Sequence, residues 1–307
     1  MRVLAEVHTM NDAAVIEQLL DALRKQTRPP DAIMLVDNAS TDDTLNRSFP
    51  DNVTIVRNAK NLGTSGGVRL GFDHALRHGF DWTWVFDADS VPEPNVLEEL
   101  LAFYGRLPES ERQRICFLAC WPRSVTGEVK ERPIVLEPSG LTYLSPNDPA
   151  DFVQCDCTLW SGSLYRMAAV AKIGLPSDNY VLDIAEVEYG YRARELGFTS
   201  CIVNAPVIRH DVGREPGAPQ KALKLGPLRF PLYEISPPRC YYCSRNWIYF
   251  WLYQCKSRTI SRALRAVARS FVMALSFAIR PVSHYRHLIA SLRGIRDGLT
   301  MHMERRF

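Results

Sequence analysis

Short apolar runs of strand-like composition alternate with helix-like segments over the first 90 residues, and this alternation constrains the fold more than any other feature. The helix-like segments cover residues 13–25 and 71–78, and the apolar runs cover residues 3–8, 32–36, 53–56 and 82–86. Strands joined through helices form a mostly parallel sheet that is covered on its faces. The sequence therefore predicts an α/β fold with flanking helices, in which ligands bind at the carboxyl ends of the strands.

Two aspartates, Asp87 and Asp89, follow the apolar run at residues 82–86 and are separated by Ala88 alone. Carboxylates at the end of a buried strand are costly to leave unpaired. A bend there can bring both to one centre, where oxygen ligands suit Mg²⁺ or Mn²⁺ and a phosphate-bearing substrate. The alternative is a turn in which both side chains cap backbone groups.

Two polar loops follow other strand-like runs. Residues 61–67 are rich in glycine, which lets backbone N–H groups approach an anion closely. They could instead form a strand-to-helix turn that needs positive φ. Asp37 ends the run at residues 32–36 and could accept a hydrogen bond from a nucleotide base or a ribose. It could equally cap the turn that follows.

Taken together and in order, these motifs resemble a known family. Thr9-Met10-Asn11, residues 36–44, residues 61–67 and Asp87-Ala88-Asp89 are similar to the family-2 glycosyltransferases of the GT-A fold, in their rhamnosyltransferase and galactofuranosyltransferase branch. The similarity covers about residues 1–250. It implies a Rossmann-like GT-A fold and an inverting transfer of a sugar, rhamnose or galactofuranose, from a UDP or dTDP donor. The implied acceptor is a hydroxyl of a lipid-linked or cell-surface glycan.

The resemblance also assigns residues to roles. A divalent cation, Mn²⁺ or Mg²⁺, would be held by Asp87, Asp89 and His210. The acceptor or the diphosphate would be contacted by Trp160, Gly162 and Arg245. The nucleotide would be bound by Thr9, Asn11, Asp37, Asn38, Asn61, Gly66 and Asp87. Structural roles are the alternatives to two of these assignments. His210 could be a structural histidine, and the aromatic residues after Arg245 could anchor the last helices.

An inverting transfer also needs a carboxylate to take the proton of the acceptor hydroxyl. By motif position this base is Glu186, near the start of a helix-like segment, and Asp183 is the rival. Acidic residues are also favoured at a helix N-terminus for their interaction with the helix dipole. That structural interpretation of Glu186 stays open beside the catalytic one.

The last 50 residues differ in charge from the rest. From residue 258 on there are ten arginines against one aspartate and one glutamate, a net charge of +8, so with a total of +3 the remaining residues carry −5. Ile260, Leu264, Val267, Phe271 and Leu275 recur at helical spacing. A basic amphipathic helix suits an anionic membrane surface. Packing on the same domain or in a homo-oligomer is the alternative, and nucleic acid is not expected.

The expected organisation is a catalytic domain at residues 1–238 and an aromatic, Arg-rich helical region at residues 239–307. The nucleotide-sugar half would cover about residues 1–100 and the acceptor half about residues 101–238. The chain opens on a core strand rather than a signal segment, so we expect a cytoplasmic enzyme, peripheral on the cytoplasmic face of the inner membrane. Its eight cysteines are then reduced. The alternative functions are a sugar nucleotidyltransferase and a non-catalytic nucleotide-sugar-binding protein.

Overall fold

The computed structural model describes residues 1–124, 126–129, 132–137, 140–146, 150–210, 222–225, 228–231, 235–255, 260–279 and 284–304. The chain divides into two compact units: Met1–Ser177 with Tyr189–Glu215, and Asp178–Glu188 with Pro216–Phe307. The division falls inside one helix, α6. The polar, Gly/Pro-rich stretch at residues 213–220 lies outside the described residues.

The first unit is built on one large sheet. Its described strands are β1 (Val3–Thr9), β2 (Ala32–Asp37), β3 (Val53–Arg57), β4 (Trp82–Asp87), β5 (Val91–Pro92), β6 (Ile115–Arg123), β9 (Phe152–Cys155), β10 (Leu164–Arg166) and β11 (Thr199–Arg209). They run in the order β3-β2-β1-β4-β10-β6-β11-β5, and β9 pairs with β11. The β3-β2-β1-β4 half is parallel, whereas β10 is antiparallel to both neighbours. The predicted mixed, mostly parallel sheet is confirmed.

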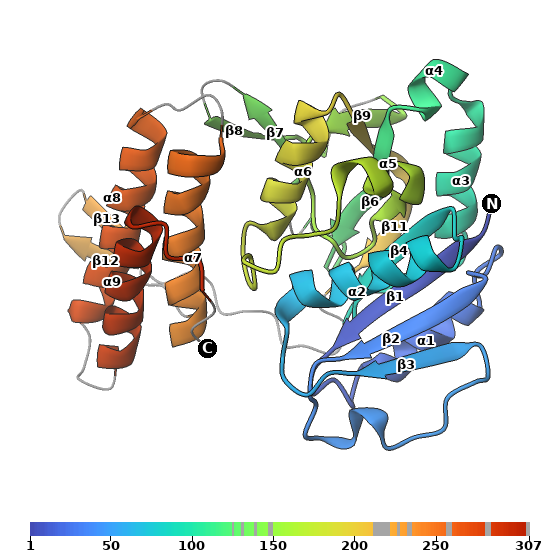
Figure 1. Cartoon of the computed structure of the whole chain (residues 1–307), viewed down its shortest axis with the longest axis horizontal. Coiled ribbons are helices and arrows are strands. Elements are labelled where there is room, and N and C mark those ends of the chain that lie inside the picture. Colours follow the sequence, from blue (N-terminus) through green and yellow to red (C-terminus); the bar gives the residue numbers. More distant parts are fainter. Residues whose placement is uncertain are drawn as a thin grey trace. The chain divides into compact units, whose positions relative to one another are not determined.

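Helices cover both faces of this sheet (Figure 1). The described helical segments of the first unit are α1 (Ile16–Arg24), the 3₁₀ turn η1 (Asp43–Leu45), α2 (Gly63–Arg77), α3 (Val96–Arg106), α4 (Glu109–Arg112), α5 (Met167–Ile173) and the larger part of α6 (Ala185–Glu195). Leu19 of α1 and Leu100 of α3 share one apolar core with Val3, Ala5 and Val7 of β1. A hairpin of β7 (Ile134–Glu137) and β8 (Gly140–Tyr143) stands apart from the sheet pairing.

Helix α2 corrects one boundary that was expected from the sequence. It begins at Gly63, so Gly66 and Gly67 lie inside its first turns rather than in a loop before residue 71. The side chain of Asn61 accepts a hydrogen bond from the Gly63 N–H at 2.7 Å and so satisfies one of the free donors at the helix start. The glycines are tolerated because this helix packs very closely on β1: a Cβ at Gly67 would lie 2.6 Å from the Cβ of His8.

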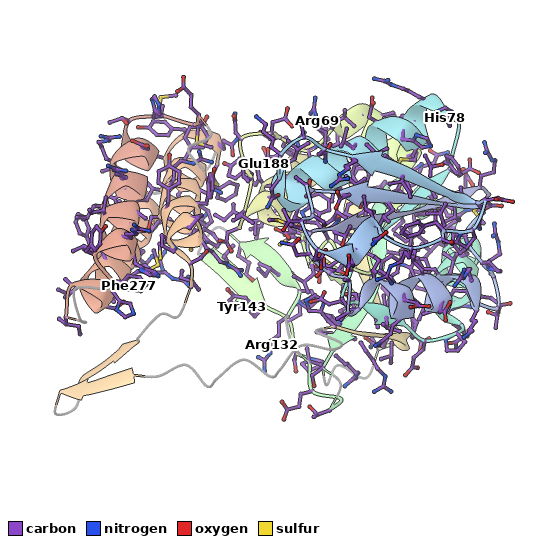
Figure 2. The ribbon with its side chains drawn as sticks, turned by 90° about the horizontal axis from the view of Figure 1, so that it is seen from below. Arg69, His78, Arg132, Tyr143, Glu188 and Phe277 are labelled. Carbon is purple, nitrogen blue, oxygen red and sulfur yellow. The ribbon has the colours of Figure 1, made fainter. Side chains whose placement is uncertain are left out.

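The second unit is mainly helical. Its described elements are the strands β12 (Ala222–Leu225) and β13 (Leu228–Pro231), the helix α7 (Pro237–Tyr249), the π-helical turn η2 (Phe250–Gln254), and the helices α8 (Ile260–Ala278) and α9 (Tyr285–Leu299). Helices α7 and α9 pack closely because Gly294 and Gly298 face α7, and a Cβ at Gly294 would lie 2.4 Å from the Tyr241 carbonyl oxygen. Phe277 of α8, labelled in Figure 2, is buried in the same core.

Candidate active site

Strand pairing brings two distant segments of the first unit together at the end of β4. After Asp87 the chain turns, with the Ser90 N–H donating to the Asp87 carbonyl at 3.1 Å, and enters β5. Val91 of β5 pairs with Arg209 at the end of β11. His210, the next residue, therefore lies beside the turn that carries Asp89.

The result is a three-residue cluster that could hold a metal ion. Among the described residues, Asp87, Asp89 and His210 each offer one ligand atom, and these atoms lie within 4.8 Å of one another. Asp89 is buried, whereas Asp87 keeps 33% of its side chain exposed, so the cluster opens toward solvent on one side. Carboxylate oxygens suit Mg²⁺ and Mn²⁺, and a neutral imidazole is a common metal ligand. The predicted ligand set is thus brought together, although its occupancy by metal stays a prediction.

Two serines support this cluster from behind. The Asp87 N–H donates to the Ser161 hydroxyl at 2.9 Å, and that hydroxyl donates to Ser90 at 2.7 Å. The Ser90 oxygen lies 2.6 Å from Nδ1 of His210. When Nδ1 carries the proton of that bond, Nε2 keeps the lone pair with which imidazole binds metals. Ser90 and Ser161 were not singled out from the sequence, because a hydroxyl contact across this distance in the chain leaves no local pattern.

A second group behind the cluster was also missed. His8 at the end of β1 lies with Nε2 2.5 Å from Oδ1 of Asp87 and with Nδ1 3.3 Å from Oε2 of Glu6. Burial disfavours the imidazolium, but the two flanking carboxylates outweigh it and hold the pKa of His8 well above its ordinary value. The signal was present in the sequence, since Glu6 and His8 are two ionisable residues on one face of an otherwise apolar strand.

The predicted nucleotide residues gather at the carboxyl ends of the neighbouring strands. Thr9 of β1 is in register with Asp37 of β2, next to the His8–Asp87 pair of β1 and β4. Asn11 has a positive φ of 58°, and its side-chain oxygen accepts a hydrogen bond from the Thr41 N–H at 2.8 Å. These residues therefore line up along the same sheet edge as the candidate metal ligands.

Several of these side chains have partners within the protein. The fully buried Asp37 carboxylate accepts from the Ser40 N–H at 3.2 Å, as in the capping alternative, and lies 3.5 Å from Nε of Arg57. Asn38 accepts from the Leu62 N–H at 3.2 Å and ties the end of β2 to the start of α2. The contacts of Asp37, Asn38, Asn61 and Gly66 with a nucleotide stay predictions.

The predicted acceptor turn is packed against β4 and β11. Trp160 is buried in an aromatic cluster, with its ring 5.2 Å from that of Tyr165. Gly162 has a φ of 82°, and a Cβ there would lie 2.3 Å from the Cδ1 atom of Ile208. The turn therefore needs glycine for packing, while its contact with an acceptor stays a prediction.

The two candidate bases belong to the second unit and are described within it. Glu186 is half-buried in the first turn of α6, and Asp183 precedes that helix. Oδ1 of Asp183 lies 3.1 Å from Nη2 of Arg239. The consecutive residues Asp183 and Ile184 both have positive φ, 55° and 66°. Residues other than glycine in such a strained backbone conformation are concentrated at functional sites.

Arg245 is fully buried in α7 of the second unit. Its guanidinium donates to the Glu304 carbonyl at 3.1 Å and also to the Asn179 carbonyl, and it lies 4.9 Å from the ring of Tyr242. These contacts explain the burial of Arg245 without a ligand, and its predicted contact with diphosphate or acceptor stays untested.

The fold can be compared with solved structures. A mixed, mostly parallel sheet with flanking helices is shared with structures of GT-A glycosyltransferases, and the chain matches several of them. It superposes on S. aureus TarS 1-349 in complex with UDP-GlcNAc with a TM-score of 0.55 at 15% identity, covering 99% of this chain and 93% of that one. A longer S. aureus TarS structure matches over 45% of its own length.

A second structural neighbour is the mannosyltransferase PcManGT from Pyrobaculum calidifontis, in complex with GDP-Man and Mn²⁺. The TM-score is 0.54 at 15% identity, over 97% of this chain and 87% of that one. At these identities the likeness establishes the GT-A fold that was expected from the sequence.

Sequence comparison points to the same class of enzyme. Residues 7–110 match the family model for glycosyl transferase family 2. The chain is 29% identical over 207 residues to the galactofuranosyltransferase GlfT1 of Mycobacterium tuberculosis. This alignment covers 65% of this chain and 67% of the relative. The protein is therefore a glycosyltransferase that is similar to family 2 over residues 7–110, as the motifs had indicated.

Proposed function

We propose that this enzyme transfers a sugar from a nucleoside-diphosphate donor to a hydroxyl of a glycan, with inversion at the anomeric carbon. The observation that carries the proposal is the convergence of Asp87, Asp89 and His210 at the sheet edge of a family-2 chain. Of the two sugars expected from the motifs, the likeness to GlfT1 favours galactofuranose over rhamnose. UDP is the corresponding nucleotide, and a lipid-linked or cell-surface glycan is the proposed acceptor.

The three ligands would hold a divalent cation, Mn²⁺ or Mg²⁺, beside the donor diphosphate. When bound, such an ion offsets the negative charge that grows on the leaving diphosphate. Thr9, Asn11 and Asp37 would contact the nucleoside from the adjoining strand ends. Of the two carboxylates near α6, Glu186 is the proposed base by its motif position, and Asp183 is the alternative. Glu186 would take the acceptor proton as the hydroxyl attacks the anomeric carbon.

We also propose that α8 binds an anionic membrane surface. One face of this helix is buried, with Ala263, Ala266, Met273, Ala274 and Phe277. Four further large apolar residues lie exposed on the helix: Ile260 is 76% exposed, Leu264 62%, Phe271 51% and Leu275 51%. Because a row of large apolar side chains is unfavourable in water, this exposed face is suited to an apolar medium or surface.

Charge favours a lipid surface as that medium. Arg265 and Arg269 are exposed beside Leu264 and Phe271, and such cations near an apolar stripe are attracted to anionic headgroups. No helix in the described part of the chain has the length and apolar content needed to span a bilayer. An interfacial helix is therefore the proposed mode of membrane binding.

A donor assay tests the proposed reaction. The full chain is incubated with UDP-galactofuranose or dTDP-rhamnose and with Mn²⁺, Mg²⁺ or EDTA, and release of the nucleoside diphosphate is followed. We expect release of UDP that depends on the cation and is lost in Asp89→Asn but not in Asp51→Asn, an exposed carboxylate of the same unit. Release of pyrophosphate from a nucleoside triphosphate and a sugar phosphate would instead indicate a nucleotidyltransferase. No turnover of any donor would overturn the proposal.

A further inference from the structure

Two buried ionisable residues of β1 lie behind the candidate cation site and have no role in the proposed reaction. Glu6 is fully buried and His8 almost so. They alternate with Val3, Ala5 and Val7, which face the apolar core on the opposite side of the sheet. An apolar strand would be easier to bury, because each buried charge carries a desolvation cost. The fold alone gives no reason for a glutamate and a histidine at these positions.

Helix α2 is adapted to this pair. A Cβ at Gly67 would lie 2.6 Å from the Cβ of His8, and a Cβ at Gly71 would lie 2.3 Å from the Cγ of Glu6. Both distances are far inside normal van der Waals contact. The two glycines, four residues apart on one face of the helix, leave the space that Glu6 and His8 occupy.

The pair ends on a candidate metal ligand. His8 and Asp87 are in register on the parallel strands β1 and β4, which places Nε2 of His8 2.5 Å from Oδ1 of Asp87. The other ring nitrogen lies 3.3 Å from Oε2 of Glu6. Both ring nitrogens of His8 are therefore within hydrogen-bond distance of a carboxylate, and a single line of contacts runs from Glu6 through His8 to one oxygen of Asp87.

We infer that Glu6 and His8 are positioning residues that fix the Asp87 carboxylate for cation binding. The inference rests on the proposed cation site. With 33% of its side chain exposed, Asp87 could otherwise turn toward water. The bond from His8 occupies Oδ1 and holds the rotamer, and Glu6 fixes the ring of His8 in turn. Partners behind a metal ligand commonly change metal affinity by about 10- to 100-fold when they are removed.

Two amide variants separate positioning from simple packing. In His8→Gln the side-chain amide reaches the place of Nε2 and can still donate to Asp87. In His8→Asn the amide reaches only the place of Nδ1, toward Glu6. The dissociation constant of Mn²⁺ in the presence of UDP is measured by the loss of the free Mn²⁺ electron paramagnetic resonance signal. We expect His8→Asn to weaken Mn²⁺ binding by about 10- to 100-fold and His8→Gln to stay near the wild type.

A third variant tests the same point without a buried charge. Glu6→Leu/His8→Phe replaces the pair with apolar side chains, a change that often preserves or raises stability. We expect this variant to fold, to bind Mn²⁺ as weakly as His8→Asn, and to recover much of its transfer rate at saturating Mn²⁺. Leu4→Val, on the same face of β1, is the matched control and should bind Mn²⁺ normally.

The outcomes distinguish this inference from the proposed function. Equal Mn²⁺ affinity in the wild type, His8→Asn and the folded double variant would overturn the positioning role and leave the cation site intact. If the double variant does not fold, the comparison of His8→Asn with His8→Gln decides, and equal weakening in both would also overturn it. Absence of Mn²⁺ binding by the wild type in the presence of UDP would overturn the cation site itself, and the inference with it.

Discussion

The side chain of Asn246 donates a hydrogen bond to the main-chain carbonyl of Asp183 at 3.1 Å and thereby holds the turn before α6. The same amide donates to the Leu182 carbonyl at 2.7 Å. Asp183 and Ile184 adopt left-handed backbone conformations, each of which costs about 1–2 kcal/mol for a residue with a side chain. Glu186 is the second residue of α6, two positions after Ile184, so these bonds offset the strain of the turn that places the candidate base.

Replacing Asn246 with alanine should therefore affect both stability and catalysis. The loss of hydrogen bonds to buried carbonyls should lower the free energy of unfolding by about 1–3 kcal/mol. The kcat for sugar transfer should fall while the KM for the donor changes little, because the first unit is untouched. Chemical denaturation and steady-state kinetics measure the two effects.

Ser244→Ala is the matched control for this change. Ser244 is equally buried in α7, and its hydroxyl has no hydrogen bond within the described part of the chain. Its removal should leave both stability and kcat close to the wild type. A normal kcat in a folded Asn246→Ala enzyme would mean that the turn does not position a catalytic group.

The assignment of the base is tested by Glu186→Gln. An amide cannot accept the proton of the acceptor hydroxyl, so we expect transfer to fall by about 10²- to 10⁴-fold. The thermal shift produced by the donor with Mn²⁺ should persist, because mass action depends on binding alone. Asp183→Asn is compared in the same assays, and a loss of transfer in that variant alone would move the role to Asp183.

Membrane binding is tested with vesicles. The full chain should sediment with vesicles that contain anionic lipid and much less with vesicles of phosphatidylcholine, and salt should weaken the binding. Leu264→Ser/Phe271→Ser should reduce sedimentation without changing donor hydrolysis. Val272→Ser, a less exposed position of α8, serves as the control. A dimer in solution that these same serine variants dissociate, with no vesicle binding, would point to a second copy of the chain instead.

Buried thiols predict how stability depends on pH in alkaline solution. Burial raises the pKa of Cys116 and of Cys120 to about 12, from 9.0. Above pH 9 the unfolded chain releases these protons while the folded chain keeps them, so the unfolded state binds fewer protons and stability falls as pH rises. Each thiol contributes a slope of about 1.4 kcal/mol per pH unit in this range.

Denaturation of the wild type and of Cys120→Ala between pH 8 and pH 11 measures this slope. The alanine variant loses some packing and is less stable at pH 8, but its stability should decline less steeply above pH 9. Parallel curves for the two proteins would contradict the contribution of Cys120. All eight cysteines are free in the structure.

A continuous apolar run predicted two of the central strands correctly. Residues 32–36 and 82–86 reappear as β2 and β4, each extended by the aspartate that follows. The apolar run of β6 (Ile115–Arg123) was passed over among the charged and proline-containing residues near it. Strand β10 (Leu164–Arg166) is too short for any periodic pattern, and only its pairing with β4 and β6 defines it.

The order of the motifs was enough to predict the candidate metal ligands. The parts of the site that depend on tertiary contacts could not be predicted from the sequence. The order of motifs pointed to Asp87, Asp89 and His210, which the structure brings together. No local pattern could show that residues 178–188 fold with the C-terminal helices, because that grouping depends on bonds from Arg245 and Asn246 across more than 60 positions of the chain. The apolar stripe of α8 was expected, whereas its outward orientation depends on which face packs.

The fit between Gly71 and Glu6 has a consequence for how this chain can diverge. A methyl group at position 71 would fall 2.3 Å from the Cγ of Glu6, so alanine at position 71 is compatible only with a much smaller residue at position 6. Position 71 cannot gain a side chain first, whereas position 6 can change while Gly71 stays. If the glutamate is first replaced by a small residue, alanine can be accepted at position 71. Once alanine is there, a glutamate at position 6 no longer fits.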